Sequence, residues 1–192
     1  KMIESMALKL SEAGIGKSPL SEIAKSVENK NMDINKLDES VVKEISKGCP
    51  IEGNGGNWDG ERGNSNWILD KEYIPQKYNP DGMTFGEILD KFNIENPKIL
   101  FKEGYPDFSG ISKGEVQIDE FTSSRADNFT QADEKLSKQW GVSPEDVSKW
   151  RKENRYTWHE CEDCKTMQLV PSEIHGNVSH FGGVSIAKSR EV

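Results

Sequence analysis

All three histidines of the chain lie close to its C-terminus, where they could form one chemical site. His159, His175 and His180 fall within the last 34 of the 192 residues. An imidazole can deprotonate water, bind a divalent metal ion or contact a phosphate group. One histidine alone is usually an ordinary polar residue, but three in one short segment indicate a shared function. We therefore expect these side chains to converge on one metal ion or phosphate.

The residues around the histidines predict the order strand, strand, helix. Residues 156–160 (Tyr-Thr-Trp-His-Glu) alternate as in a strand, and residues 166–170 are typical of a second strand after a short turn. Residues 171–173 (Pro-Ser-Glu) suit the start of a short helix. This order places the first histidine near the end of the first strand, and the other two on the helix or just beyond it.

The spacing of His175 and His180 requires a break in that helix if both are to bind one ion. Five residues along an uninterrupted helix turn two side chains about 140° apart. Gly176 and Asn177 could end or bend the helix between them, and Gly182 with the glycine after it would let the chain turn afterwards. If the helix instead continues, His175 would face elsewhere, for example towards a phosphate.

These residues resemble the nuclease core of the HNH/endonuclease VII superfamily. More narrowly, they are similar to the Trp-His-His and Trp-His-Glu branch of the His-Me finger nucleases, found at the C-termini of bacterial polymorphic toxins, including contact-dependent and Rhs-type effectors. The similarity covers roughly residues 57–184. Its motifs are Trp158-His159-Glu160, Lys165 to Pro171, Ile174-His175 and Ser179 to Gly183, with upstream matches at Arg62 to Trp67, Pro75 to Lys77, Asn79 to Gly82, Gly104 to Ser109 and Ser148 to Asn154.

The resemblance implies a metal-dependent endonuclease. Hydrolysis of a phosphodiester needs a base that deprotonates water and a divalent cation, here Mg, Mn, Zn or Ni, that neutralises charge at the phosphate. It implies His159 as the general base, His180 as the main metal ligand, and His175 as a second ligand or a group that orients the phosphate. Glu160 stands where the Trp-His-His relatives have a second histidine. The roles of His159 and Glu160 could therefore be exchanged, with the histidine binding metal and the glutamate acting as base.

The same segment also suits a structural zinc module. Cys161-x2-Cys164, followed by His175-x4-His180, is close to a two-Cys, two-His finger, which has the same order of strands and helix. A proline and a glycine interrupt the long helix that such a finger would use. The nuclease is therefore the preferred interpretation, and the alternatives are a zinc-binding interaction module or an adaptor without catalysis.

Basic residues close to the predicted site are candidates for phosphate contact. Arg151, Lys152 and Arg155 lie in a segment with four basic residues and one acidic residue, directly before the first strand of the core. Arg62, in a glycine-rich loop, is a further candidate. The ordinary alternatives are a solvated helix face for the basic segment and a simple chain turn for the loop.

The elements that must hold these residues fall into two parts. Apolar residues recur at helical spacing through residues 1–48 and predict short helices. From Cys49 to Asn66 the composition changes abruptly to glycine and asparagine, which indicates a boundary. We therefore expect residues 1–50 to form a helical connector, or a segment used in entering a cell. Residues 51–192 would form the nuclease toxin domain, with its ββα core at about 156–183.

The middle of the chain predicts a mixture of strands and helices. Thr84 suits the cap of a helix that buries its apolar residues, and residues 79–82 suit a turn. Extended segments are expected near 67–68, 73–75, 98–101 and 115–118, and helices near 126–139 and 143–154. The expected fold class is therefore α+β.

Net charge and hydropathy limit how the protein can bind nucleic acid or associate with a membrane. Lys and Arg number 25 against 33 Asp and Glu, a net charge of -8. This charge opposes broad, passive adhesion to nucleic acid, so any such contact must be local. No apolar run approaches the ~18 residues of a membrane span, so no span is expected. The first residue, Lys1, suggests a piece of a longer protein.

The resemblance also implies a biological setting. Toxin domains of this kind are secreted from the producer as the C-terminus of a larger protein with its delivery apparatus. They act on nucleic acid in the cytoplasm of the target bacterium, and a cognate immunity protein neutralises them in the producer. The usual habit of the superfamily favours DNA over RNA as the substrate.

Overall fold

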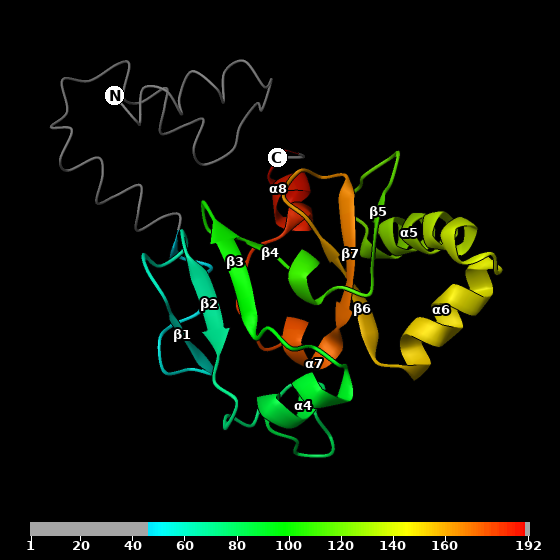
Figure 1. Ribbon diagram of the computed structural model, residues 1–192. Helices are drawn as coiled ribbons and strands as arrows, with labels where there is room; N and C mark the ends of the chain where they lie inside the picture. Colours follow the sequence, from blue (N-terminus) through cyan, green and yellow to red (C-terminus); the bar gives the residue numbers. More distant parts are fainter. Residues whose placement is uncertain (1–45, 191–192) are drawn as a thin grey trace, which may run out of the picture.

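The computed structural model describes residues 46–190 of the chain (Figure 1). The helices expected in the first 45 residues lie outside this part. The described residues form two antiparallel sheets with helices packed around them, which confirms the α+β class. Within them, no helix is both long and apolar enough to cross a bilayer.

The first sheet has four short strands in the order β1-β2-β3-β4. They span Gly56–Trp58, Asn66–Leu69, Lys98–Lys102 and Tyr105–Asp107, and each pairs antiparallel with its neighbour. Alternate side chains of β2 and β3 point into an apolar core, among them Trp67 and Phe101. The extended segment expected at residues 73–75 forms no strand.

Helix α4, Phe85–Lys91, covers this core, and its start is the predicted one. The Thr84 hydroxyl accepts a hydrogen bond from the Glu87 backbone N–H, while the Glu87 carboxylate accepts one from the Thr84 backbone N–H. This reciprocal capping satisfies two N–H groups that the first helical turn leaves without partners. Ile88, on the buried face of α4, is 0% exposed.

The glycine- and asparagine-rich segment belongs to this packed region. Cys49 is buried in the same apolar core as Trp67, and Nη2 of Arg62 donates a hydrogen bond to the Cys49 carbonyl at 2.7 Å. Gly63 has a φ of +85°, and its carbonyl accepts a hydrogen bond from the Gly104 N–H at 2.9 Å. The change in composition at this point therefore reflects tight turns between short strands.

The second sheet has three strands in the order β5-β7-β6. They span Gly114–Gln117, Tyr156–Glu160 for β6 and Thr166–Pro171 for β7, and the central β7 pairs antiparallel with both neighbours. A short 3-10 turn, Ser109–Ile111, connects the two sheets. The strands expected near 98–101, 115–118, 156–160 and 166–170 are confirmed.

Four helices accompany the second sheet, and the two longer ones form a layer beside it (Figure 1). They are α5, Arg125–Trp140; α6, Pro144–Glu153; α7, Ser172–His175; and α8, Gly183–Arg190. Both longer helices begin at a serine cap, Ser124 and Ser143. Their predicted positions are confirmed.

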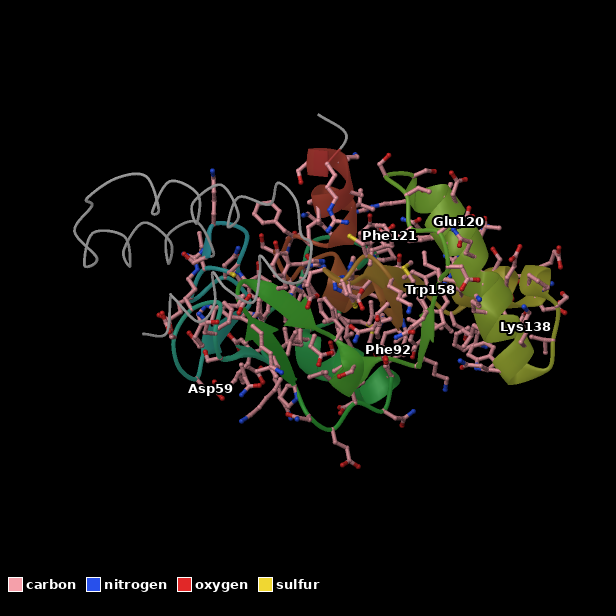
Figure 2. The ribbon with its side chains drawn as sticks, turned by 90° about the horizontal axis from the view of Figure 1, so that it is seen from above. Asp59, Phe92, Glu120, Phe121, Lys138 and Trp158 are labelled. Carbon is pink, nitrogen blue, oxygen red and sulfur yellow. The ribbon has the colours of Figure 1, made fainter. Side chains whose placement is uncertain are left out.

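A buried ion pair joins this helical layer to the sheet. Asp133 of α5 accepts hydrogen bonds from Nε and Nη2 of Arg151 on α6, at 3.1 and 2.8 Å. It also accepts one at 2.7 Å from the indole N–H of Trp158, which lies in the interior beside α5 (Figure 2). Because one carboxylate holds three elements, the motif tryptophan of β6 is fixed against both helices.

Candidate metal centre and active site

The structure brings the three histidines together. His159 is the fourth residue of β6, His175 ends α7, and His180 lies in the loop before α8. One ring nitrogen from each lies within 4.8 Å of the others. Nδ1 of His159 lies 3.2 Å from Nε2 of His175.

The expected break between His175 and His180 is present. Helix α7 has only four residues and stops at Gly176, and no helix forms again until α8 begins at Gly183. Because the chain leaves the helical path here, His180 can return to the same point as His175. A long, uninterrupted helix would have separated them.

Phe108 lies against all three imidazoles and covers the side of the cluster that faces the apolar core. Its ring centroid is 4.8 Å from that of His159, 5.5 Å from His175 and 5.4 Å from His180, and Phe108 is fully buried. The side-chain oxygen of Gln168 on β7 accepts a hydrogen bond from the Phe108 backbone N–H at 2.9 Å. The histidine cluster therefore rests on an apolar surface that the second sheet holds in place.

Burial keeps these imidazoles neutral at physiological pH. It is the main reason that the pKa of His159 and of His175 lies well below the usual value, and the neighbouring histidines lower both further. Burial also lowers the pKa of His180 to about 4. A neutral imidazole has a free nitrogen lone pair, which is the form that binds metal ions.

The hydrogen bonds around the rings fit a metal site. Nδ1 of His180 lies 2.7 Å from the Val178 carbonyl oxygen, which can only accept, so the proton sits on Nδ1 and the Nε2 lone pair is free. A backbone carbonyl that receives the outer N–H is the usual support of a metal-binding histidine. Nε2 of His159 is buried without a hydrogen-bond partner.

The spacing of His159 and His175 also fits, and the ligand atoms of all three histidines lie within 4.8 Å of one another. Two imidazole ligands of a tetrahedral zinc, at about 2.0–2.1 Å from the metal, lie about 3.3 Å from each other. The nitrogens of His159 and His175 are 3.2 Å apart. The donor set, its neutral state and its spacing therefore suit a divalent metal ion.

Glu160 and Arg125 stand beside the histidines in one small cleft. Its lining is formed by Arg125, His159, Glu160, His175, His180, Gly182, Val184 and Ser185. The Glu160 carboxylate accepts a hydrogen bond from Nδ2 of Asn128 at 2.9 Å and lies 3.3 Å from Nε of Arg125. Burial raises the pKa of Glu160, although Asn128 and Arg125 both oppose that rise.

Arg125 is the site residue that sequence reasoning missed. It is the first residue of α5, 34 positions before His159, and 68% of its side chain is exposed. No motif marks it, and only the packing of α5 against β6 brings it to the cleft. The one available signal was the Ser124 cap, which indicates that Arg125 begins a helix.

The four basic residues proposed from the sequence lie away from the cleft lining. Arg151 differs most from expectation, because it is buried and both arms of its guanidinium bind Asp133. Arg155 pairs with Asp81 at 3.0 Å, and Arg62 donates to a backbone carbonyl. Lys152 is exposed on α6. We therefore do not assign Arg151 a contact with substrate.

The two cysteines near the histidines are not placed as metal ligands. Among the described residues, the three histidines form the group of His, Cys, Asp and Glu side chains that could hold an ion, and neither cysteine is in it. Cys161 is buried, which raises its pKa, and Cys164 sits in the turn between β6 and β7 with a φ of +53°. The two-Cys, two-His zinc interpretation is thus not supported.

Comparison with known protein families bears on the part of the chain that contains this site. Residues 98–182 match the family Colicin-DNase, described as the DNase/tRNase domain of colicin-like bacteriocin. The match supports a nuclease toxin domain. The matched segment contains the three histidines, Glu160 and Arg125, so every charged or imidazole side chain of the cleft falls inside it. No curated protein matches the chain.

Proposed function

We propose that this chain is a metal-dependent endonuclease of the HNH, or His-Me finger, type that cleaves DNA in preference to RNA. The observation that carries the proposal is the convergence of three neutral imidazoles in a cleft beside Glu160 and Arg125. The match to a colicin-like nuclease domain over the same residues supports it independently. DNA is preferred because it is the usual substrate of this superfamily.

In this proposal His159, His175 and His180 hold the metal ion. When bound, a divalent cation neutralises charge on the scissile phosphate and on the leaving oxygen. His159 is thus given the role of ligand in place of the general-base role expected from the resemblance. The reason is geometric, because its Nδ1 faces the nitrogen of His175 at 3.2 Å and its Nε2 is buried.

Glu160 is then the base that takes a proton from the attacking water. A base works best when its pKa lies near the working pH, and burial moves the pKa of this carboxyl upwards. Asn128 and Arg125 each contact one of its oxygens and so fix its orientation. The exposed guanidinium of Arg125 is suited to bind a phosphate oxygen at the same time, because its planar fork presents several N–H donors.

The test is cleavage of plasmid DNA and of total RNA by the purified chain, with and without EDTA. We expect nicked plasmid that EDTA abolishes and added divalent metal restores. Glu160→Gln should reduce the rate about 10²–10⁴-fold, the usual contribution of a positioned base, while metal binding measured by calorimetry persists. The matched control is Glu162→Gln in the neighbouring turn, which should remain active. Cleavage that survives EDTA, or a fully active Glu160→Gln variant, would overturn the proposal.

The biological part of the proposal follows from the toxin match and the resemblance together. The part of the chain from residue 46 onwards would act as the C-terminal toxin domain of a secreted effector in competition between bacteria. Residues 1–45 would serve delivery, which moves the expected boundary at 50/51 upstream because Cys49 is buried in the core of the first sheet. A cognate immunity protein would protect the producer. Removal of residues 1–45 should leave a nuclease that kills when made inside an unprotected cell but not when presented from outside, as scored by survival.

A further inference from the structure

The segment that separates His175 from His180 has little structure of its own. After α7 ends, its regular hydrogen bonds are those of the turn at Gly176 to Val178, whose N–H groups donate to carbonyls of α7. Yet this segment must return His180 to His175 for one ion to reach both. Contacts from elsewhere in the molecule therefore have to fix its path.

Asn177, in the middle of this turn, makes such contacts with all the capacity of its side-chain amide. Its Oδ1 accepts hydrogen bonds from the backbone N–H groups of Gln76 and Lys77, at 3.1 and 2.9 Å. Its Nδ2 donates to the carbonyls of Lys77 and Glu173, both at 2.7 Å. One side chain thus binds the turn both to α7 and to a loop that lies 100 residues earlier in the chain.

Packing at the neighbouring residues reinforces this attachment. The ring of Tyr78 lies so close to Gly176 that a Cβ atom there would be 2.5 Å from Cδ2 of the tyrosine. On the far side of the turn, the Ser179 hydroxyl donates to the Gly48 carbonyl at 2.9 Å, and Val178 is 2% exposed. The loop at 76–78 and Gly48 both lie outside the segment matched to the nuclease family, residues 98–182.

We infer that Asn177 is a positioning residue of the metal site, acting through the residues on either side of it. The inference rests on the proposed function, since it assumes that His175 and His180 share one ion. The amide sets where α7 ends and where the chain turns, and the two histidines are two and three residues away. The upstream part of the chain is then a component of the site, because it supplies the loop that Asn177 binds.

The experiment measures the Zn²⁺ affinity of the wild type and of Asn177→Ala, both as the full chain, by calorimetric titration. Loss of a residue that supports a metal ligand commonly weakens metal binding about 10–100-fold, and we expect a Kd increase in that range. The matched control is Asn64→Ala, which removes an asparagine that accepts a hydrogen bond from the Glu103 N–H at 2.9 Å, between two loops that connect strands of the first sheet. That variant should bind Zn²⁺ as the wild type does.

A second readout does not depend on metal. Labelling of the metal-free proteins with diethyl pyrocarbonate, followed by mass spectrometry, measures how accessible each imidazole is. His175 should react faster in Asn177→Ala than in the wild type, while the control stays unchanged. If the alanine variant does not fold, Asn177→Ser keeps a hydroxyl at the position and serves for both measurements.

The outcomes separate this inference from the proposed function. Equal Zn²⁺ affinity and equal labelling in variant and wild type would overturn the positioning role and leave the nuclease proposal intact. A wild type that binds no divalent metal would overturn the nuclease proposal, and the labelling rates would then decide whether Asn177 positions His175. Weaker binding and faster labelling confined to the Asn177 variants support the inference.

Discussion

The two sheets of the molecule differ in what they bury. The four-stranded sheet and α4 enclose an almost entirely apolar core, built around side chains such as Trp67, Ile88 and Phe101. Within the described residues, the buried polar and charged side chains all lie between residues 128 and 173, on or around the three-stranded sheet. They are Asn128, Asp133, Ser137, Arg151, His159, Glu160, Gln168 and Glu173.

This difference indicates that the two sheets have different roles, one in stabilising the fold and one in holding the groups of the site. Apolar burial stabilises a fold in proportion to area and demands no orientation, whereas a buried polar group must find a partner or destabilise the protein. Among the described residues, Nε2 of His159 and Oε2 of Glu173, both around the second sheet, are buried without one, and so is Nε of Arg62 beside the first sheet. We conclude that the first sheet chiefly stabilises, while the second accepts an energetic cost in order to hold reactive groups.

The largest effect should come from removing one histidine of the cluster. His180→Ala should lower the rate of plasmid cleavage about 100-fold or more, because metal assistance contributes several kcal/mol to the transition state. The free energy of unfolding of the metal-free protein should change little, since His180 lies in a loop, is only partly buried and belongs to neither apolar core. Nicking assays and urea titrations measure the two. A variant that cleaves normally would remove His180 from the site.

Breaking the polar network of the second sheet should cost more stability than any single change at its surface. Asp133→Ala leaves the Arg151 guanidinium and the Trp158 indole N–H without their shared acceptor. Loss of one partner of a buried ion pair costs about 3–5 kcal/mol, measurable by urea unfolding. The control, Glu134→Ala, changes the exposed neighbour and should stay within about 0.5 kcal/mol. Equal stabilities for the two variants would contradict this assignment.

A cavity in the first sheet should lower stability without touching the chemistry. Ile88→Ala should reduce the free energy of unfolding by about 2–5 kcal/mol. Its cleavage rate per folded molecule should nevertheless match the wild type at a temperature where both are folded. Ile74→Ala, at a residue 47% exposed, is the control with the same change in side chain. Lost activity in folded Ile88→Ala protein would contradict the conclusion that the first sheet contributes to stability and not to the chemistry.

A pH dependence of stability that originates in the second sheet gives a further test of the comparison. Folding lowers the pKa of all three histidines, so between about pH 6.5 and pH 4 the unfolded chain binds more protons than the folded one. Stability of the metal-free protein should therefore fall as the pH falls, by up to about 1.4 kcal/mol per pH unit for each histidine. Glu160 and Glu162, whose pKa values burial raises, act in the opposite direction.

Urea titrations of metal-free protein at several pH values would show this slope. His175→Gln should flatten it, because one histidine no longer takes up a proton on unfolding. A stability that does not change between these pH values would mean that the histidines are not desolvated as the structure has them.

The sequence predicted the elements whose signals are local. Thr84 and Ser143 mark helix starts, alternation marks β6 and β7, and Gly176 marks the end of α7. The β1 strand was missed, because three residues in a glycine- and asparagine-rich stretch carry no period. β1 forms a strand only because it pairs with β2 in the folded molecule, and no local pattern reports that pairing.

For the site, the histidine cluster was predictable because all its members lie close together in the chain. Arg125 was not, since it reaches the cleft only through the packing of α5. The prediction that Arg151 contacts phosphate missed its buried position for the same reason. It sits in a basic run that is typical of an exposed face, and its partner Asp133 lies 18 residues earlier on another helix.

Because the three histidines lie close together in the chain, a bound metal ion should stabilise the folded protein less than its affinity suggests. His180 lies 21 positions after His159, and the entropy lost in closing so short a loop is modest. An unfolded chain can therefore chelate the same ion, although it has lost Phe108, Arg125 and the rest of the cleft. Because a ligand stabilises only through its preference for the native state, added metal should raise the melting temperature by less than its affinity for the folded protein implies.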